Sequence, residues 1–460
     1  MAKYTMSAIK ADLSAVMGKE AILNGNIPEA YTHDEALELD PIDPLGVVFP
    51  TSDEQVADLV DYASHSNIAL VARGSGTGLS GGARPVTDGL VVSFEHMNRI
   101  LSIDTIDQTA RVEPGVTLAQ LEEALAGTPY FYPVYPGEMS ATLGGNVATN
   151  AGGMRAMKYG VTRHNVLGLA FVTGSGIRAR SGGAYVKTSS GYDLTQLLIG
   201  SEGTLALVTE VLVRLSLRAH TRTLILASFR NFEDLANAVV SIPERGLLPS
   251  ILEYVEATGL AAMAQHAGVS LGVSANVAAT TSAYLMIELE AMNDEDLSWQ
   301  LNEVMGLLDV HHSTEQYLLD EGQRQGLINA REAAFWTVKA LGATIILDTV
   351  VPRSQLATLF AGAASCAREH DTLLVGTGHV GDGNVHLSLF ASDPVECHAA
   401  ATAIVHLATS IGGAVSGEHG IGVAKRQLFL EQEPPPRLGL LHSIKSVFDP
   451  DNLLNPGKLL

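Results

Sequence analysis

Cysteine is scarce in this chain, since Cys366 and Cys397 are the only two among 460 residues. Two cysteines cannot build a disulfide-stapled scaffold, a zinc site of four cysteines or an iron–sulfur cluster held by four local cysteines. Because disulfides are rare in reducing compartments, this composition favours a cytoplasmic protein.

Positive charge is also in short supply. Lysine and arginine number 28 against 50 aspartates and glutamates, which gives a formal net charge of −22. Such a chain has no electrostatic footprint for binding nucleic acid or an anionic membrane. We therefore expect its partners to be small molecules or another protein.

Long hydrophobic runs are missing as well. No stretch approaches the roughly 20 uninterrupted apolar residues that a membrane-spanning helix requires. Residues 1–20 are interrupted by Lys3, Lys10, Asp12 and Lys19, so we expect no signal peptide. The 46% of hydrophobic residues still supplies well-buried cores for two or three domains of a soluble protein.

The first readable unit ends in a glycine loop. Residues 47–49 predict a strand, and Thr51 with Glu54 predicts a capping box for the helix that follows. Asn67 should end that helix, and the apolar residues 68–71 predict a second strand. This strand leads directly into residues 73–78, so a ligand loop should lie at its carboxyl end.

The rest of the chain predicts an α+β protein with three parts. Residues 205–217 read as a strand that closes a first domain, 1–220. Strands such as 284–290 and helices such as 333–340 predict a second α+β domain, 221–425. After the three prolines 434–436, a C-terminal segment, 426–460, should contain one helix over 438–448 and a turn at 455–457.

Gly76, Gly78 and Gly81 satisfy the GxGxxG pattern of a Rossmann turn, but their context argues against one. A Rossmann loop opens a helix, whereas residues 82–88 contain Pro85 and lead into an apolar strand from Leu90. The alternative is a nest of backbone N–H groups that binds a pyrophosphate without a helix.

A second cluster of small residues spans 136–153. Its glycines would let the backbone approach a flat ring closely, and its polar side chains, Ser140, Thr142, Asn146, Thr149 and Asn150, offer hydrogen bonds to a heterocycle. Each glycine taken alone could equally serve a tight turn. The two clusters together favour cofactor binding.

His379 and His386 are seven residues apart, which on one straight strand would put them on opposite faces. The run Gly381-Asp382-Gly383-Asn384 between them predicts a hairpin that returns both imidazoles to a common face. Either histidine alone would ordinarily be structural. With the carboxylate of Glu418 they form a recurrent ligand set for a divalent metal, and zinc, manganese and iron all tolerate it.

The sequence resembles the FAD-binding proteins of the PCMH type (vanillyl-alcohol oxidase superfamily), and within them the D-lactate dehydrogenase, glycolate oxidase subunit and D-2-hydroxyglutarate dehydrogenase group. The resemblance covers nearly the whole chain. Its strongest motifs are ARGSGTGLSGG (72–82), PGEMSATLGGNVATNAGG (136–153), KYG (158–160), GSEGTL (200–205), GHVGDGNVH (378–386), SGEHGIG (416–422) and NPGK (455–458). It implies a two-subdomain FAD-binding domain, an α+β cap domain for the substrate, and a C-terminal segment that packs back on the FAD domain.

The resemblance also implies a cofactor site in which residues 74–78 wrap the FAD pyrophosphate and 136–153 line its rings. Members with covalently attached flavin carry a histidine or cysteine in these loops, and neither stands at 72–82 or 136–153, so we expect non-covalent FAD. The implied FAD-binding residues are Arg73, Gly74, Ser75, Gly76, Thr77, Gly78, Pro136, Gly137, Ser140, Thr142, Gly145, Asn146, Thr149, Asn150, Gly152, Gly153, Glu202, Gly203, Val208 and Asn455.

The roles implied for the remaining motifs describe oxidation of a D-2-hydroxy acid. His379, His386 and Glu418 match the metal ligands, His419 the general base and Arg331 the residue that binds the substrate carboxylate. An ion pair with Glu332 or another neighbour is the structural alternative for Arg331. Lys339, two helical turns further on, is a weaker candidate for the same cavity.

Two departures from the family pattern bear on the substrate. Ile346 stands where the hydroxyglutarate enzymes place a lysine, and Ser388 where they place an asparagine. Both changes favour a monocarboxylate such as D-lactate. The rivals are a D-2-hydroxyglutarate dehydrogenase, a glycolate oxidase-type subunit, a non-catalytic electron-relay subunit and an NAD-dependent Rossmann dehydrogenase.

The electron acceptor stays open between an electron-transferring flavoprotein, a quinone and a cytochrome. Residues 31–35 and 350–353 look most similar to lactate dehydrogenases that use the flavoprotein, which favours that partner.

Overall fold

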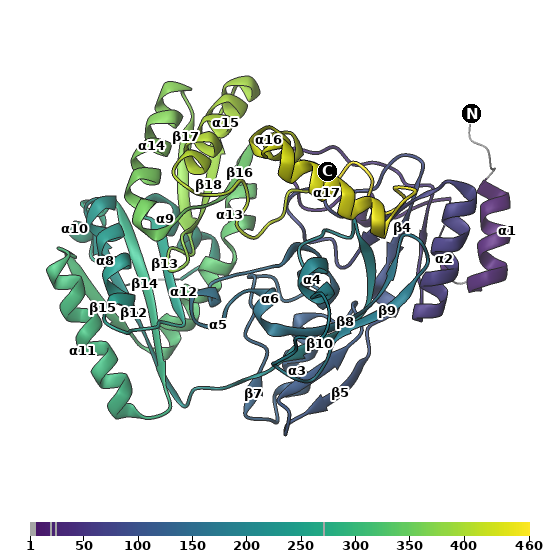
Figure 1. The fold of residues 1–460 in the computed structure, drawn as a ribbon. Coiled ribbons are helices and arrows are strands. Elements are labelled where there is room, and N and C mark those ends of the chain that lie inside the picture. The colour runs from purple at the N-terminus through teal and green to yellow at the C-terminus, as the bar shows by residue number, and fades with distance from the viewer. Residues whose placement is uncertain (1–5, 19–20, 24, 270–271) are drawn as a thin grey trace.

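The computed structural model describes residues 6–18, 21–23, 25–269 and 272–460. Helices and strands are mixed throughout, and Figure 1 shows two halves side by side, a purple-to-teal half and a teal-to-green half. The expected α+β class is therefore confirmed. The prediction for residues 1–20 falls partly outside the described residues.

The first sheet has four strands in the order β1-β2-β4-β3. Strands β2, β4 and β3 are parallel and β1 is antiparallel to β2. Their bounds are β1 Ile22–Leu23, β2 Gly46–Val48, β3 Ala69–Arg73 and β4 Gly89–Ser93. Helix α2 (Asp53–Ser66) packs Val56, Leu59 and Val60 into the core of this sheet, and α1 (Met6–Met17) lies beside α2.

The second sheet is antiparallel, with five strands in the order β5-β6-β10-β8-β9. The strands are β5 Ile100–Asp104, β6 Thr109–Val112, β8 Val166–Thr173, β9 Arg178–Gly182 and β10 Ala206–Arg214. Strands β7 (Tyr130–Phe131) and β11 (Ser216–Leu217) form a separate two-stranded antiparallel sheet. The helices of this half are α3 Leu118–Leu125, α4 Leu143–Thr149, α5 Ala156–Tyr159, α6 Thr162–Asn165 and α7 Leu194–Leu198.

The third sheet has seven antiparallel strands in the order β15-β12-β14-β13-β17-β18-β16. Its strands are β12 Thr221–Phe229, β13 Ile251–Glu256, β14 Ala283–Ala291, β15 Glu315–Leu319, β16 Ile345–Val350, β17 Leu373–Gly378 and β18 Asn384–Phe390. Neighbouring residues of β12 belong to different cores, Leu224 to one and Ile225 to the other, as the period of two requires for a sheet covered on both faces.

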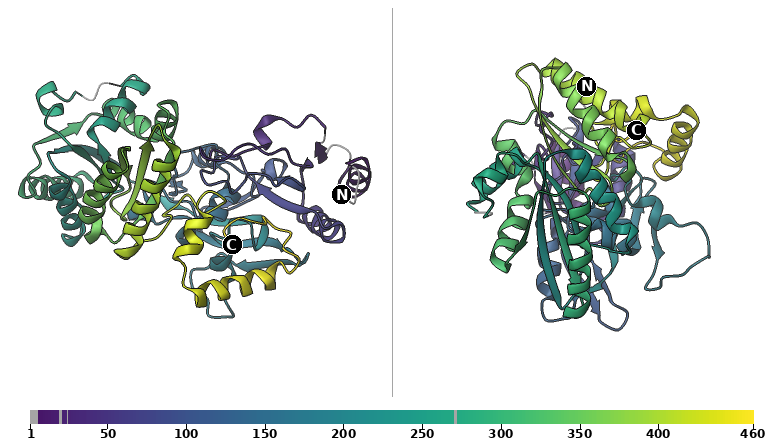
Figure 2. Two further views of the ribbon diagram at one scale, coloured as in Figure 1. Left: turned by 90° about the horizontal axis from the view of Figure 1, so that it is seen from above. Right: turned by 90° about the vertical axis from the view of Figure 1, so that its left-hand side faces the viewer.

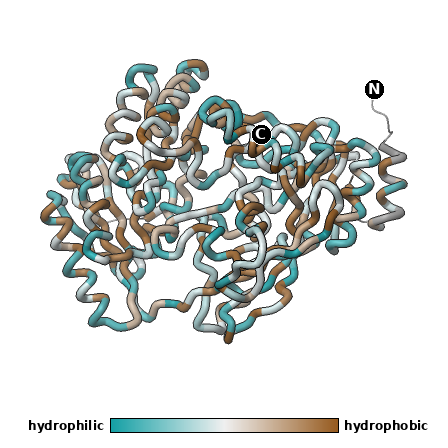
Figure 3. The backbone as a smooth tube through the Cα atoms, viewed as in Figure 1, coloured by the Kyte–Doolittle hydropathy of each residue, from teal (hydrophilic) through white to brown (hydrophobic). Residues whose placement is uncertain are grey.

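Helices cover both faces of that sheet. One core is formed with α8 (Phe232–Glu244), α11 (Asp294–Val310), α14 (Leu356–Glu369) and α15 (Pro394–Ser410). The other is formed with α9 (Ala257–Ala267), α12 (Glu321–Glu332) and α13 (Ala334–Ala340), and it includes Met154 from the first half. Apolar and polar residues alternate along these outer helices (Figure 3), as expected for helices with one buried and one solvated side.

The C-terminal residues return to the first half (Figure 2). After α16 (Arg426–Gln432), helix α17 (Pro435–Phe448) packs Ile444 and Phe448 on the core of the five-stranded sheet. Leu454 pairs with Leu70 of β3 and is fully buried. The limits of the three domains, 1–220, 221–425 and 426–460, remain our prediction.

Most of the expected elements are present, with three local corrections. The C-terminal segment contains two helices where one was expected, and Pro435 and Pro436 begin α17 instead of preceding it. The N-cap of α2 is Ser52, whose hydroxyl accepts from the N–H of Gln55, so the predicted box of Thr51 and Glu54 is wrong by one residue. Residues 143–149 form helix α4, which the sequence analysis did not predict, because Thr142 caps its first turn and Leu143 and Val147 are buried.

Two other structural expectations for this half are confirmed. Asn67 ends α2 in the left-handed conformation, with φ 51°. The GxGxxG residues open no helix, since the next element after β3 is strand β4. Among the described residues, no helix has the length and apolar content needed to cross a lipid bilayer.

Candidate functional site

A first cavity opens at the carboxyl end of β3 and contains most of the residues expected at FAD. The expected residues that line it are Arg73, Gly74, Ser75, Gly76, Thr77, Gly78, Pro136, Thr142, Gly145, Asn146, Thr149, Gly152, Glu202, Gly203, Val208 and Asn455. Gly137 lines a second, adjacent cavity. Ser140, Asn150 and Gly153 are not among the lining residues of either.

Two of these three have other partners. The Ser140 hydroxyl donates to Glu138 at 2.8 Å, and the side-chain oxygen of Asn150 accepts from the N–H of Arg163 at 3.0 Å. Sequence reasoning missed Ser80 and Gly82, which also line the first cavity and continue the glycine loop.

The glycine loop is fixed from outside the cavity. Nη1 of Arg73 donates to the carbonyl of His33 at 2.7 Å, and the N–H of Glu35 donates to the carbonyl of Gly78 at 2.8 Å. Gly76 has a φ of +80°, and a side chain there would run into the Arg73 guanidinium. Glycine is therefore required at 76 for both conformation and space, and Arg73 acts as the support beneath the loop.

An FAD molecule fits this cavity chemically. Nδ2 of Asn146 is buried without a hydrogen-bond partner in the described part of the chain, although Asn146 lines the cavity. A buried amide donor is costly unless a ligand or water satisfies it. The backbone N–H groups of the glycine loop suit a pyrophosphate, so the residues present match the pyrophosphate and a polar ring of a flavin dinucleotide.

Glu202 and Asn455 hold loops together beside this cavity. The Glu202 carboxylate accepts from the N–H groups of Ile421 at 2.8 Å and Gly422 at 2.7 Å, and burial raises its pKa. Nδ2 of Asn455 donates to the Glu202 carbonyl at 2.6 Å, and its Oδ1 accepts from the N–H of Ala72 at 3.2 Å. Their side chains thus tie the 416–422 and 455–458 motifs to the flavin loop.

The two predicted metal histidines meet as the hairpin prediction requires. β17 and β18 are antiparallel neighbours, and the rings of His379 and His386 are 4.9 Å apart between centroids. Oε1 of Glu418 lies 2.9 Å from Nε2 of His379 and 3.2 Å from Nε2 of His386. One candidate ligand atom from each of the three residues therefore lies within 4.8 Å of the others, close enough for a single metal ion to bind all three.

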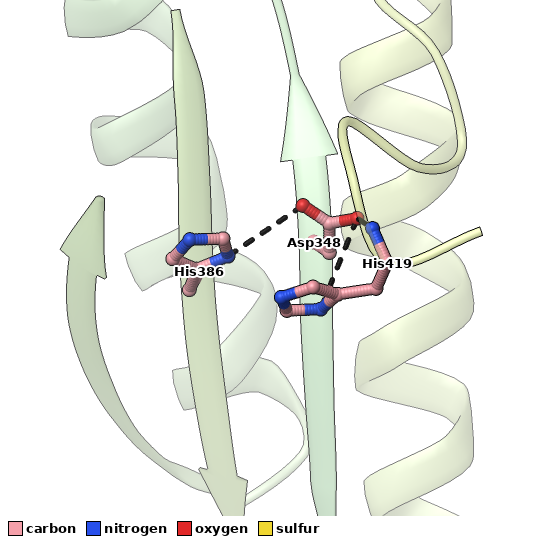
Figure 4. Close-up of side chains that lie close together, drawn as sticks. All are labelled: Asp348, His386 and His419. Atoms are coloured by element: carbon pink, nitrogen blue, oxygen red, sulfur yellow. Dashed lines mark hydrogen bonds and ion pairs between the residues drawn. The ribbon is translucent and has the colours of Figure 1, made fainter. Parts of the chain in front are cut away.

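Asp348 is a central residue of the site that the sequence analysis did not single out. Its Oδ2 accepts from the backbone N–H groups of Gly417 at 3.0 Å, Glu418 at 3.0 Å and His419 at 2.8 Å. It pairs in register with His386, whose Nδ1 lies 3.5 Å from Oδ1 (Figure 4). The signal that could have found it is the pairing of β16 with β18, a long-range feature.

The pKa values of His379 and His419 are shifted in opposite directions. Burial opposes protonation of His379, but the carboxylates of Glu253 and Glu418 outweigh it and hold its pKa well above the usual range. Burial lowers the pKa of His419 to about 4. Its imidazole, stacked on His386 at 4.9 Å, is thus neutral near pH 7 and can accept a proton.

Arg331 lies in the second cavity and is buried. Its Nε donates to Oε2 of Glu253 at 2.9 Å, and Oε1 of the same carboxylate lies 2.5 Å from Nδ1 of His379. Glu253, which sequence reasoning missed, is fully buried on β13. It joins the expected carboxylate-binding arginine to an expected metal ligand.

Lys339 is the predicted site residue that the structure places elsewhere. Its Nζ pairs with Oε2 of Glu35 at 2.5 Å, and its side chain is 42% exposed. It is not among the lining residues of the first or second cavity. In the structure Lys339 bridges α13 and the segment that supports the flavin loop, because a carboxylate outside the two cavities holds its ammonium.

The two cavities meet at residues 416–422, which carry His419 and which we call the histidine loop. Leu79, Pro136, Glu418 and His419 line both of them. Gly152 allows this close approach, since a Cβ there would lie 2.5 Å from Oε2 of Glu418. A ligand in the first cavity and a ligand in the second would therefore both contact the loop that carries His419.

Comparisons with known proteins agree with this arrangement. Residues 44–182 match a family described as FAD binding domain, and residues 218–459 match one described as FAD linked oxidases, C-terminal domain.

The chain is 47% identical to an uncharacterised FAD-linked oxidoreductase of Mycobacterium tuberculosis, over 98% of this chain and 99% of that one. It is 35% identical to a D-lactate dehydrogenase of Archaeoglobus fulgidus, covering 94% and 97%, and 33% identical to the glycolate oxidase subunit GlcD of Bacillus subtilis, covering 98% and 96%. A substrate-bound structure of p-cresol methylhydroxylase has the same fold, with a TM-score of 0.80 at 17% identity over 98% and 95% of the two chains.

Proposed function

Because the chain belongs to the family of FAD-linked oxidases and dehydrogenases with a PCMH-type flavin domain, we propose that it oxidises a small D-2-hydroxy acid, such as D-lactate, to the 2-oxo acid. The observation that carries the proposal is the shared wall of the two cavities. His419 and Glu418 line both the cavity that fits FAD and the cavity that contains Arg331.

The oxidation removes the Cα hydrogen as hydride and the hydroxyl hydrogen as a proton, and an FAD bound in the first cavity would supply the hydride acceptor. His419 is the candidate to receive the proton, since burial keeps its imidazole neutral. The hydrogen bond that the backbone N–H of His419 donates to Asp348 fixes the loop that carries this base. We also infer that the FAD is non-covalent, and acid precipitation should release it; flavin retained in the pellet would contradict this.

A divalent cation, zinc, manganese or iron, bound by His379, His386 and Glu418 would lower the pKa of the substrate hydroxyl. The carboxylate of Glu253 faces Nδ1 of His379, and that of Asp348 faces Nδ1 of His386. Histidines that bind metals usually have such a carboxylate partner, which orients the ring. Such outer contacts fix which ring nitrogen is free to bind, and here Nε2 of both histidines faces Glu418.

The second cavity favours a monocarboxylate. Ile346 and Ser388 line it and are cross-strand partners on β16 and β18. Each lies two residues from Asp348 or His386 and thus on the same face of the sheet. The apolar side chains of Phe335 and Val338 also line the cavity, so a second substrate carboxylate would have no cation beside Ile346.

Two alternatives within the family remain distinct proposals. A D-2-hydroxyglutarate dehydrogenase would need a cation other than Lys339, which is paired with Glu35. A glycolate oxidase-type subunit would act in a complex, and the similarity to GlcD is its support. We propose an electron-transferring flavoprotein or a quinone as the acceptor and the cytoplasm as the location.

The proposal is tested by assaying the purified protein on a panel of D- and L-2-hydroxy acids with an artificial dye as electron acceptor. We expect turnover of D-lactate and related D-monocarboxylates, little with D-2-hydroxyglutarate and none with the L-acids. Preference for an L-acid, or a yellow protein that oxidises none of the panel, would contradict it.

A further inference from the structure

A third cavity, of about 590 Å³, lies between the flavin half and the seven-stranded sheet. Its walls include Phe131 of β7 and Arg218 from the flavin half, and Glu288 of β14 and Arg324 of α12 from the other. The cavity is polar and lies outside the site described above. We call it the arginine cavity, because Arg155, Arg218, Arg222 and Arg324 all line it.

The carboxylates of this cavity already have partners. Glu122 pairs with Arg218 at 2.8 Å, Glu288 with Arg324 at 2.5 Å, and Glu290 with Lys158 at 2.9 Å. Glu332, the fourth, is hydrogen-bonded to the hydroxyl of Tyr135.

Arg155 is different, because no carboxylate in the described part of the chain forms an ion pair with it. Its guanidinium instead lies over two aromatic rings, with Cζ 5.6 Å from the centroid of Phe131 and 5.2 Å from that of Tyr135. Stacking holds a guanidinium in place through its faces and leaves its N–H groups, which lie in the plane, for a ligand. Arg155 is therefore a positioned cation with no carboxylate within ion-pair distance in the described part of the chain, and Glu332 acts on it only through its charge.

The arginine cavity adjoins the second cavity, which contains Arg331 and which we call the active cavity. Tyr135 and Glu332 line both, so the hydrogen-bonded pair forms a common wall. Arg331, which directly precedes Glu332 on α12, lines the active cavity on the other side of that wall. A small anion at Arg155 would thus lie one side-chain pair away from the proposed substrate site.

We propose that the arginine cavity is a second binding site for a small carboxylate anion, centred on Arg155, that holds the acid substrate or its 2-oxo product beside the active cavity. This rests on the proposed function for the identity of the acid. The need for such a site follows from the net charge of −22. A strongly acidic protein repels anionic substrates, and a positioned arginine beside the active cavity offsets that repulsion locally.

The site is tested first with bromide, which serves as a probe independent of turnover. Crystals of wild type and of Arg155→Met are soaked in sodium bromide, and bromide is located by its anomalous scattering. We expect a bromide within hydrogen-bond reach of the Arg155 guanidinium in wild type and none there in the variant. Bromide bound at other sites but absent from Arg155 in wild type would overturn the proposal.

The second test uses the acids themselves. The KM for D-lactate and the inhibition constant for pyruvate should each rise roughly two- to fivefold in Arg155→Met, the size of one half-exposed ion pair, and the difference from wild type should shrink in high salt. Arg245→Met is the matched control, because Arg245 is exposed at the end of α8 and its loss changes the net charge equally.

An equal rise of KM in the Arg245→Met control would assign the effect to net charge and overturn the site. A rise with D-lactate alone, or with pyruvate alone, would show which acid the site holds. If the protein oxidises no hydroxy acid, the proposed function fails, while the bromide experiment still decides whether Arg155 binds an anion.

Discussion

Oδ2 of Asp348 lies 2.8 Å from the backbone nitrogen of His419 and 3.9 Å from Nδ1 of the same residue. One carboxylate on β16 thus sets both the position of the histidine loop and the surroundings of its imidazole. Two further N–H groups and the hydroxyl of Ser416 donate to the same oxygen. The rigidity of the proposed base therefore depends on Asp348.

Replacing this anchor should impair catalysis more than folding. In Asp348→Asn the side chain loses its charge, and its amide nitrogen cannot accept the bond that Nδ2 of Asn384 donates to Oδ1. Each bond to a charged group contributes about 1.5–3 kcal/mol. We expect kcat to fall by roughly a hundredfold or more. The measurement is steady-state kinetics beside flavin absorbance, with Asp58→Asn, an exposed aspartate on α2, as the control of equal charge. Unchanged kcat in Asp348→Asn would remove Asp348 from this account.

Glu253 should link metal affinity to substrate binding. Glu253→Gln keeps the size of the side chain but removes the charge that faces His379 and Arg331. Loss of such an outer carboxylate costs about 10- to 100-fold in metal affinity, and we expect that loss together with a higher KM. Metal titration of the stripped protein is the direct readout. Glu256→Gln on the same strand, whose carboxylate accepts from Gly376, should leave both values unchanged.

Metal removal should stop turnover but leave the flavin in place. The predicted ligands, His379, His386 and Glu418, meet in the second cavity, whereas the glycine loop that fits the pyrophosphate belongs to the first. Exhaustive chelation, or His386→Ala, should therefore abolish activity with FAD still bound. His398→Ala, at a largely exposed histidine on α15, is the control. Full activity in the stripped enzyme would contradict the Lewis-acid role, and loss of flavin would indicate a structural ion.

Ile346 should set the preference for monocarboxylates. An unpaired buried carboxylate costs several kcal/mol, so D-lactate should exceed D-2-hydroxyglutarate in kcat/KM by at least roughly two orders of magnitude. Ile346→Lys should narrow that ratio, while Ile346→Met, of similar length without charge, should not. Lys339→Ala completes the set. A wild-type preference for hydroxyglutarate that Lys339→Ala removes would identify Lys339 as a second anchor despite its pair with Glu35.

Local sequence patterns predicted the parts of the site that depend on nearby residues. The glycine-rich turn between His379 and His386 requires a hairpin, and Pro85 and the turn residues after Gly81 prevent a Rossmann helix. The contacts of Glu253 with Arg331 and His379 were beyond reach, because they join residues 78 and 126 positions apart. Strand order in the seven-stranded sheet brings them together, and a single sequence does not state that order.

The same limit explains why the position of Lys339 was not foreseen. Its helix was predicted, but its partner Glu35 lies 304 residues away in the other half of the molecule. Helix α4 was missed for a local reason, since glycines at 144 and 145 lower helix propensity. The burial of Leu143 and Val147 against the five-stranded sheet overrides that preference.

The central claim is that a D-2-hydroxy acid bound next to His419 reduces the flavin in the adjoining cavity. It is tested most directly by mixing the purified yellow protein with D-lactate under anaerobic conditions and following the flavin absorbance in a stopped-flow instrument. The account predicts rapid bleaching with D-lactate, none with L-lactate, and a rate at least roughly a hundredfold lower in His419→Ala, because general-base catalysis contributes about 10²–10⁴-fold. Bleaching by L-lactate, or full-rate bleaching in His419→Ala, would contradict it.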